Sequence, residues 1–275
     1  MITRIYDATD SESWWAYVRR TGDDVFKYRH ALKNIVMSMV QQRYRRSFFG
    51  VLWSFLNPLL NLDIMAIVFS LMFNQDPLQF SVYQMSGIVT WTFLSVSVNT
   101  GTQALIHAEG YLKKLYVPKI LFSLVVTCNE LVNFGFGLFG YYVIGLMFGL
   151  SLSLTHLLLP IAMFVLAIFS LGITLILSSI TVYFRDITHF VQVILQGLMW
   201  FTPIYFKLDF IPEASRYLFT YNPFYYLVTL MRRLIYDNQF PSLQEWLIPI
   251  GIALGTLIVG LWVLKKCERT LIYRL

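Results

Sequence analysis

Charge is scarce in this chain. Of its 275 residues only 13% are Asp, Glu, Lys or Arg, whereas 57% are hydrophobic, and a typical soluble domain is about 25% charged. The two cysteines, Cys128 and Cys267, do not fit a disulfide framework. Residues 1–30 contain no apolar core before a small-residue cleavage site, so we expect no cleaved signal peptide. The composition predicts an integral membrane protein.

Motifs of catalysis and of nucleotide binding are also missing. The sequence has no HExxH motif, no Cys/His cluster and no Ser-His-Asp spacing, so we predict neither an enzyme nor a metal site. None of the fifteen glycines is followed by lysine, which excludes a GxxxxGK(S/T) P-loop. We therefore expect no cofactor in this chain. If the protein works with ATP, another chain binds the ATP and Mg²⁺.

Six apolar stretches are long enough to cross a membrane. A helix needs roughly 20 apolar residues to cross about 30 Å of hydrocarbon, and these runs are continuous, as membrane helices require. The predicted fold class is therefore an all-α polytopic membrane protein with six transmembrane helices. The predicted spans are residues 50–73, 83–106, 120–149, 155–183, 188–206 and 245–264.

The positive charges are distributed unevenly about these spans. Of the 21 lysines and arginines, 17 lie in the N-terminal segment, in the links after spans two and four, or in the C-terminal tail. This asymmetry predicts that both termini lie in the cytoplasm. It also accounts for the net charge of +6 without a nucleic-acid partner. We divide the chain into a cytoplasmic segment (1–47), a transmembrane domain (48–265) and a cytoplasmic tail (266–275).

Two cytoplasmic segments have helical patterns. Apolar residues recur at helical spacing in residues 32–40, which predicts an amphipathic helix in the membrane interface. This helix either only anchors span one or also shapes a surface for a soluble partner. In the link HAEGYLKKLYVPK (107–119), Lys113 and Lys114 lie opposite an apolar stripe. The link is either a short docking helix or a simple basic turn. The stripe consists of Tyr111, Leu112, Leu115 and Tyr116.

The outer link, residues 207–244, is too apolar for an ordinary loop. Pro212 and Pro223 each stand where a helix can start, so we predict two short outer helices. They form either an external gate or a structural lid. Within the spans we find two acids, Asp63 and Glu130, and buried charges of this kind mark function. A secondary carrier would need a denser relay of acids and histidines, and a membrane glycosyltransferase would need clustered acids on a loop.

Aromatic residues make up 17% of the chain. Flat rings pack against the apolar faces of sugars, and they also form lipid-facing belts at membrane interfaces. Both interpretations remain open for each residue. The candidates for a channel lining that contacts a glycan are Trp53, Phe55, Phe69, Phe73, Trp91, Trp200, Phe201 and Tyr205.

Four blocks in order along the chain resemble the membrane subunit of bacterial ABC-2-type exporters for O-antigen, capsule and teichoic-acid polysaccharides. The likeness covers about residues 30–265. Drug exporters share this topology, so an exporter of a small lipophilic compound is the alternative. The blocks are RYRRSFFGVLWSFLNPLL (43–60), GYLKKLYVPKILF (110–122), YFRDITHFVQVILQGLMWFTPIYF (183–206) and YNPFYYLVTLMRRLIY (221–236).

The resemblance implies a homodimer of six-helix subunits in the bacterial inner membrane, with two separate ATPase subunits and a lipid-linked polysaccharide as substrate. It implies that the segment 1–28 is longer than in the family. It also implies three sets of site residues. The coupling helix that docks on the ATPase would contain Glu109, Gly110, Tyr111, Leu112, Lys113, Lys114, Leu115 and Tyr116. The interface helix, about 30–46, would contain Arg43, Arg45 and Arg46, and the outer gate would contain Pro212, Tyr217, Pro223, Phe224 and Tyr225.

Overall fold

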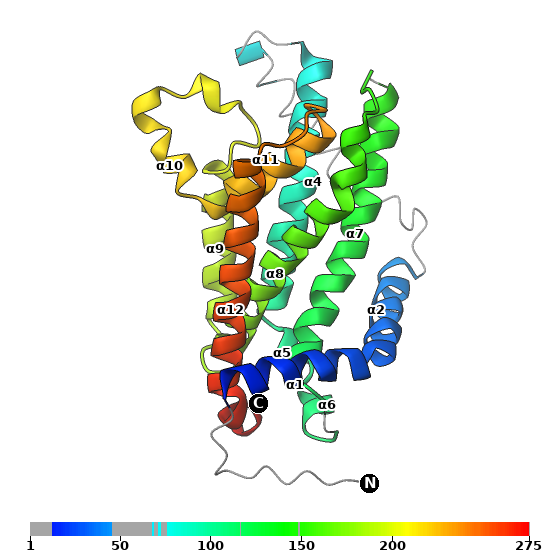
Figure 1. Cartoon of the computed structure of the whole chain (residues 1–275), viewed down its shortest axis with the longest axis vertical. Helices are drawn as coiled ribbons and strands as arrows, with labels where there is room; N and C mark the ends of the chain where they lie inside the picture. Colours follow the sequence, from blue (N-terminus) through cyan, green and yellow to red (C-terminus); the bar gives the residue numbers. More distant parts are fainter. Residues whose placement is uncertain are drawn as a thin grey trace.

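The long helices of the computed structural model stand side by side in an upright bundle (Figure 1). The structure describes residues 13–45, 68, 71–72, 76–115, 117–147 and 149–274. The bundle helices are α4 (Pro77–Gly101), α7 (Ile120–Met147), α8 (Leu159–Thr181), α9 (Ile187–Trp200) and α12 (Leu243–Arg274).

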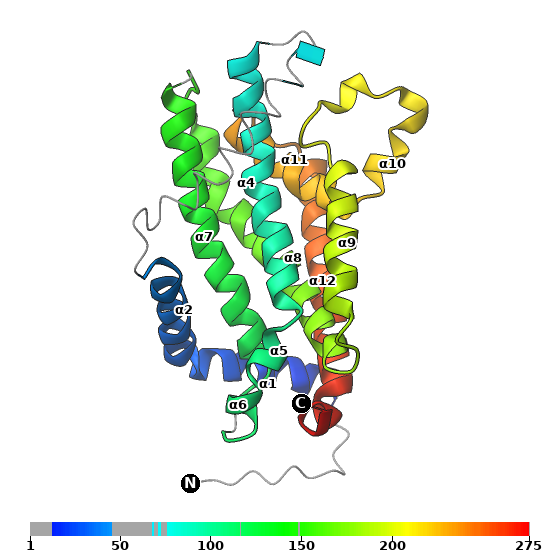
Figure 2. The ribbon, with the colours of Figure 1, turned by 180° about the vertical axis from the view of Figure 1, so that it is seen from behind.

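Short elements gather at the two ends of the bundle. At one end, which we call the α6 end, α1 crosses the bundle, and α6 extends beyond it (Figures 1 and 2). We call the opposite end the α11 end. The elements at the α6 end are α1 (Trp14–Lys27), α2 (Arg29–Tyr44), α5 (Ala104–His107) and α6 (Glu109–Leu112). Those at the α11 end are α10 (Tyr217–Thr220), α11 (Pro223–Ile235) and three 3-10 turns, Leu154–Leu158, Leu208–Phe210 and Glu213–Ser215.

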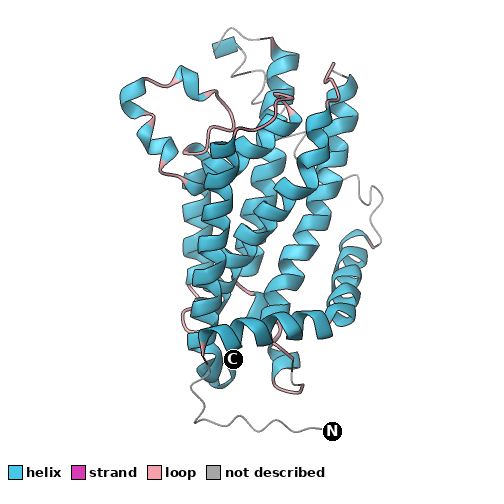
Figure 3. Ribbon diagram, in the orientation of Figure 1, coloured by secondary structure: helices cyan, strands magenta, loops and turns pink. Residues whose placement is uncertain are grey.

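Over the described residues the regular structure is entirely helical, which confirms the predicted all-α class for this part of the chain (Figure 3). Three of these helices are long and apolar enough to cross a membrane: Ile120–Met147, Leu154–Thr181 and Leu243–Glu268. They coincide with three of the predicted spans. Cys128 and Cys267 carry free thiols.

The other predicted spans have different outcomes. α4 and α5 cover most of 83–106, and α9, Ile187–Trp200, is a shorter apolar helix that covers the first part of 188–206. α9 ends at Trp200 rather than at the predicted boundary because Pro203 follows closely, and proline cannot continue a helix. The span 50–73 lies almost wholly outside the described residues. The count of six spans therefore stays a prediction.

α4 lies within the bundle and carries buried polar side chains. Gln84, Ser86 and Thr90 are fully buried, and a polar group away from water needs a partner within the protein. The Ser86 hydroxyl donates to the Tyr83 carbonyl at 2.6 Å, and the Gln84 amide donates to the Tyr205 carbonyl at 3.3 Å. These partners let α4 pack on α7, α8 and α11 although its sequence is less apolar than those of α7 and α8.

α8 and α12 make the closest contact in the bundle, and two glycines permit it. A Cβ atom added at Gly172 would lie 2.5 Å from the backbone of Thr256 and Leu257. A Cβ atom at Gly260 would lie 2.5 Å from the Gly172 carbonyl oxygen. Small residues at such crossings let two membrane helices approach closely and gain van der Waals contact.

This contact gives a direct test. We predict that Gly172→Ala or Gly260→Ala lowers the free energy of unfolding by about 1–3 kcal/mol, because the methyl group overpacks a backbone contact. Gly255→Ala is the matched control. Gly255 lies on α12, as Gly260 does, and no atom stands within 4 Å of its Cβ position. Thermal unfolding in detergent measures the difference. Equal melting temperatures for all three variants would contradict the account.

Candidate functional site

The predicted docking link forms one helical turn at the α6 end. α6 spans Glu109–Leu112, and Lys113 donates to the Glu109 carboxylate at 2.6 Å. This hydrogen bond and the lysine charge lower the pKa of Glu109. Arg185, from the link between α8 and α9, lies close enough to contribute to the same shift. Two links that are far apart in sequence therefore meet at this end.

The apolar stripe predicted in this link divides into two parts. Leu112 is buried against a small hydrophobic cluster with Leu105 and Ile120. Tyr111 and Leu115, by contrast, are each 59% exposed. Gly110 and Lys114 lie within or beside the same turn, and Tyr116 lies outside the described residues. The link thus offers an exposed apolar pair on an anchored turn.

The amphipathic helix predicted within residues 32–40 is α2, which packs on α7. Arg43 near its end reaches the carboxylate of Glu130 at 3.3 Å. The Glu130 side chain is 8% exposed and also accepts hydrogen bonds from Asn129 and Asn133. The acid identified inside span three is therefore paired with one of the predicted interface arginines. Arg45 is exposed, and Arg46 lies outside the described residues.

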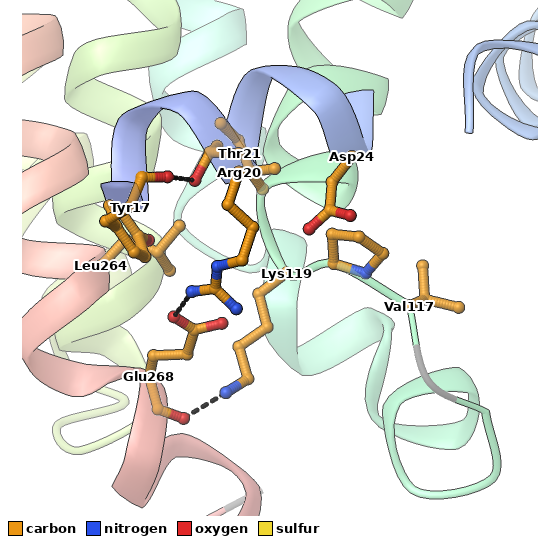
Figure 4. A pocket seen from close by; sticks show the side chains of 10 residues that line it. Tyr17, Arg20, Thr21, Asp24, Val117, Lys119, Leu264 and Glu268 are labelled. Atoms are coloured by element: carbon orange, nitrogen blue, oxygen red, sulfur yellow. Dashed lines mark hydrogen bonds and ion pairs between the residues drawn. The ribbon is translucent and has the colours of Figure 1, made fainter. Parts of the chain in front are cut away.

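A second charged cluster joins α1, the docking link and α12 (Figure 4). Arg20 pairs with the carboxylate of Glu268 at 3.4 Å, and the Lys119 ammonium donates to the Glu268 carbonyl. Burial lowers the pKa of Lys119, Glu268 partly offsets the shift, and Arg20 adds to it. Tyr17, which is buried, lies under Arg20 and Lys265. Movement of the link is thereby tied to α1 and to α12.

At the α11 end, Arg232 is 7% exposed and holds three elements together. It donates to the Tyr83 hydroxyl at 2.9 Å and to the Ser86 hydroxyl at 3.3 Å, both on α4. It also donates to the Pro203 carbonyl at 2.8 Å in the turn after α9. Its guanidinium lies 4.0 Å from the centre of the Tyr83 ring. A Cβ atom at Gly87 would lie 2.3 Å from the Arg232 guanidinium, so a larger residue there would displace this group.

Side-chain contacts at both ends of α11 join it to the rest of the bundle. Pro223 occupies the first turn, as predicted, and Asn222 caps the helix by accepting from the Phe224 amide at 3.0 Å. The Asn222 side chain also donates to Thr202 at 2.8 Å. At the other end Arg233 pairs with Glu245 of α12 at 2.8 Å. α11 is therefore fixed to the bundle along its whole length.

The stretch between α9 and α11 is more exposed. Pro212 precedes the short turn Glu213–Ser215, and Tyr217 opens α10. Tyr217 and Tyr221 are exposed. The predicted gate residues thus belong to two different environments, since Phe224 is buried and Tyr225 is half-buried on α11.

The residues predicted to line the channel also differ in their exposure. Trp91 is buried and its ring lies 5.4 Å from that of Phe224, while Tyr205 is buried beside Trp200 at 5.6 Å. Trp200 and Phe201 are about half exposed. Their role as lining stays a prediction. Residues outside the described part of the chain are Trp53, Phe55, Phe69, Phe73 and the acid Asp63.

Comparison with known proteins identifies the family. The sequence profile of the ABC-2 type transporter family matches residues 30–236, which include α2, the docking link and α11. The chain belongs to the ABC-2 type transporter family. The match leaves out α1 and α12, although both pack on the docking link.

Three known proteins that are similar to this chain share one name. The chain is 29% identical to an "O-antigen export system permease protein RfbA" of Myxococcus xanthus, over 87% of this chain and 91% of the relative. Two Klebsiella pneumoniae proteins of that name are each 28% identical. They cover 71% and 82% of this chain, and 76% and 87% of their own lengths. The chain is therefore similar to these relatives over most of their length.

Sequence reasoning missed the roles of Arg232 and Glu268. The charge distribution leaves Arg232 among the four cations outside the predicted cytoplasmic segments and says nothing of its partners, although an arginine in an otherwise apolar helix is a signal of a buried partner. Glu268 had no such signal, because it stands in a charged tail and its partner Arg20 lies 248 positions away. Both contacts depend on the packing of helices that are distant in sequence.

Removing Arg232 should loosen the α11 end. We predict that Arg232→Met lowers the free energy of unfolding by about 3 kcal/mol or more, because buried carbonyls and hydroxyls lose their donor. Arg233→Met, next along the same helix, should cost only about 1 kcal/mol since its side chain is 38% exposed. Thermal unfolding of the two variants gives the comparison. Equal losses would contradict the assigned roles.

The ion pair between Arg43 of α2 and Glu130 of α7 gives another test. We predict that Arg43→Gln lowers the free energy of local opening of α2 by about 1 kcal/mol, between the usual values for exposed and buried ion pairs. Arg45→Gln is the matched control, because Arg45 is also exposed but makes no ion pair with the described residues. Hydrogen exchange of the α2 amides measures the change. Unchanged exchange in the Arg43 variant would show that the pair does not hold α2.

Proposed function

We propose that this chain is the permease subunit of an ATP-driven ABC exporter that moves a lipid-linked polysaccharide, such as an O-antigen, across the bacterial inner membrane. The family match over residues 30–236 carries the transporter assignment. The shared name of the three relatives supports the substrate class. An exporter of a small lipophilic compound is the alternative, because the same family topology serves that task.

In this proposal the chain crosses the membrane six times, with both termini and the α6 end in the cytoplasm. The excess of lysine and arginine in the predicted cytoplasmic segments supports this orientation. Two copies of the chain form the channel together. The α11 end then faces the periplasm, where the polysaccharide leaves the channel.

The ATPase is a separate subunit, present in two copies, because this sequence has no P-loop to hold ATP and Mg²⁺. It docks on α6. The exposed pair Tyr111 and Leu115 supports this assignment, since the pair stands on a turn that extends beyond the bundle (Figure 1). An apolar anchor surrounded by charges is the usual composition of a docking site. Glu109, Lys113 and Lys114 supply those charges.

Force applied to α6 has two routes into the bundle. Lys119 and Glu268 join the docking link to α12, and Leu112 joins it to the cluster around Leu105. α12 in turn packs on α8 through Gly172 and Gly260. Closure of the two ATPase subunits would therefore shift these helices as rigid bodies. α2, paired to Glu130 through Arg43, would follow α7.

The outer gate is the segment 207–221, which includes Pro212 and Tyr217. It moves relative to a fixed α11. The contacts of Arg232, Asn222 and Arg233 support a fixed α11. The exposed side chains of Tyr217 and Tyr221 support a segment held by fewer contacts. Trp200 and Phe201 stand half exposed at the base of this segment and offer ring faces to a sugar chain.

Deletion of the gene tests the function directly. We expect the deletion strain to lose its surface polysaccharide and to accumulate undecaprenyl-linked glycan on the cytoplasmic side. Immunoblotting of surface glycan and lipid extraction measure the two pools. Normal surface glycan together with a raised sensitivity to lipophilic compounds would instead support the alternative.

Docking through α6 gives a residue-level prediction. The double variant Tyr111→Ala/Leu115→Ala should bind the ATPase subunit about thirtyfold more weakly, because each truncation removes roughly 1 kcal/mol of contact. Its own stability should stay unchanged, since both side chains are exposed. Leu112→Ala should behave differently and destabilise the link by about 2 kcal/mol, as its side chain is buried. Undiminished ATPase binding by the double variant would exclude docking at this pair.

A further inference from the structure

α1 presents two different faces. Its inner face carries the buried Tyr17 and the Arg20 that pairs with Glu268. Its outer face carries Trp15, which is 79% exposed, and Phe26, which is 68% exposed. These two rings stand eleven residues apart, which is about three turns of helix, so they project on the same side. Arg19, one turn after Trp15, is also exposed there.

Positive charge surrounds these exposed rings. Residues 14–45, which form α1 and α2, contain seven lysines and arginines and only two aspartates. Arg29 lies 4.2 Å from the Phe26 ring, and Lys27 is exposed beside it. Exposed aromatic rings flanked by cations match an anionic lipid surface, where the rings enter the headgroup layer and the cations meet lipid phosphates.

The position of α1 along the bundle also agrees with a site at the lipid headgroups. α1 lies crosswise to the long helices, and its Tyr17 packs near Leu264 (Figures 1 and 4). At this point α12 changes from an apolar run to the charged sequence that starts with Lys265 and Lys266. Lys266 also covers the ring of Trp262 at 5.2 Å. A helix at this boundary lies at the level of the lipid headgroups.

We propose that α1 is a lipid anchor: its outer face, formed by Trp15, Arg19 and Phe26, binds anionic lipid headgroups together with the neighbouring Lys27 and with Arg29, the first residue of α2. Its inner face meanwhile holds the docking link against α12. The inference uses the proposed orientation but not the proposed substrate. An ATPase subunit fits the outer face of α1 less well than lipid does. Because α6 extends beyond α1, a subunit docked on α6 would lie farther from the bundle than α1 does (Figures 1 and 2). α1 also precedes the part of the chain that the family profile matches.

A fluorescent probe tests the anchor in nanodiscs. Cys128 and Cys267 are first replaced by serine, and bimane is attached through Phe26→Cys or, as the control on the exposed tip of the docking link, through Lys113→Cys. The nanodiscs contain phosphatidylcholine with or without phosphatidylglycerol, and a trace of lipid with a nitroxide at the headgroup. We expect a loss of fluorescence at position 26 that grows with phosphatidylglycerol, and none at position 113. An unquenched probe at position 26, or one shielded only when the ATPase subunit is added, overturns the proposal.

The unmodified chain provides a second measurement in case the labelled variants do not fold. Hydrogen exchange of the amides of residues 14–27 is compared in nanodiscs with and without phosphatidylglycerol. Slower exchange in the anionic nanodiscs supports the anchor, and equal exchange overturns it. Neither measurement follows transport, so failure of the anchor leaves the exporter proposal intact, and loss of export activity leaves the anchor intact.

Discussion

Polar and charged groups inside an apolar bundle must find their partners within the protein, because hydrocarbon offers none. This constraint determines where the helices of this chain are fixed to one another. Arg232 joins α11 to α4 and to the turn after α9. Glu130 joins α7 to α2 through Arg43. Glu268 joins α12 to α1 and to the docking link.

These three connections distinguish helices that are fixed to one another from segments that are held by fewer contacts. α11 has hydrogen-bonded partners along its length, whereas the segment before it carries exposed aromatic residues. At the other end the docking turn is anchored by Leu112 and leaves Tyr111 and Leu115 exposed. A transporter needs this combination, since a rigid body transmits displacement and a loosely held segment responds to it. The close approach of α8 and α12 at Gly172 extends the rigid part across the bundle.

Much of the fold could be predicted from the sequence, because the helices depend on local patterns. Apolar runs located α7, α8 and α12, and Pro223 located the start of α11. The end of α9 was placed too late, because hydropathy alone gives no weight to Pro203. The partners of Arg232 and Glu130 could not be predicted, since each depends on how helices distant in sequence pack together. The division between the buried Leu112 and the exposed Tyr111 likewise depends on where α7 and α12 lie. The channel role of Trp53 and its neighbours stays a prediction from the aromatic pattern and the family likeness.

Reconstitution tests the central claim most directly. The chain would be placed in liposomes together with an ATPase subunit and a lipid-linked polysaccharide, and movement of the glycan would be followed by its accessibility to a lectin outside the liposomes. The account predicts that the glycan crosses the bilayer only when both chains and hydrolysable ATP are present. Hydrolysis of ATP by the assembled complex without any movement of the glycan would contradict the account.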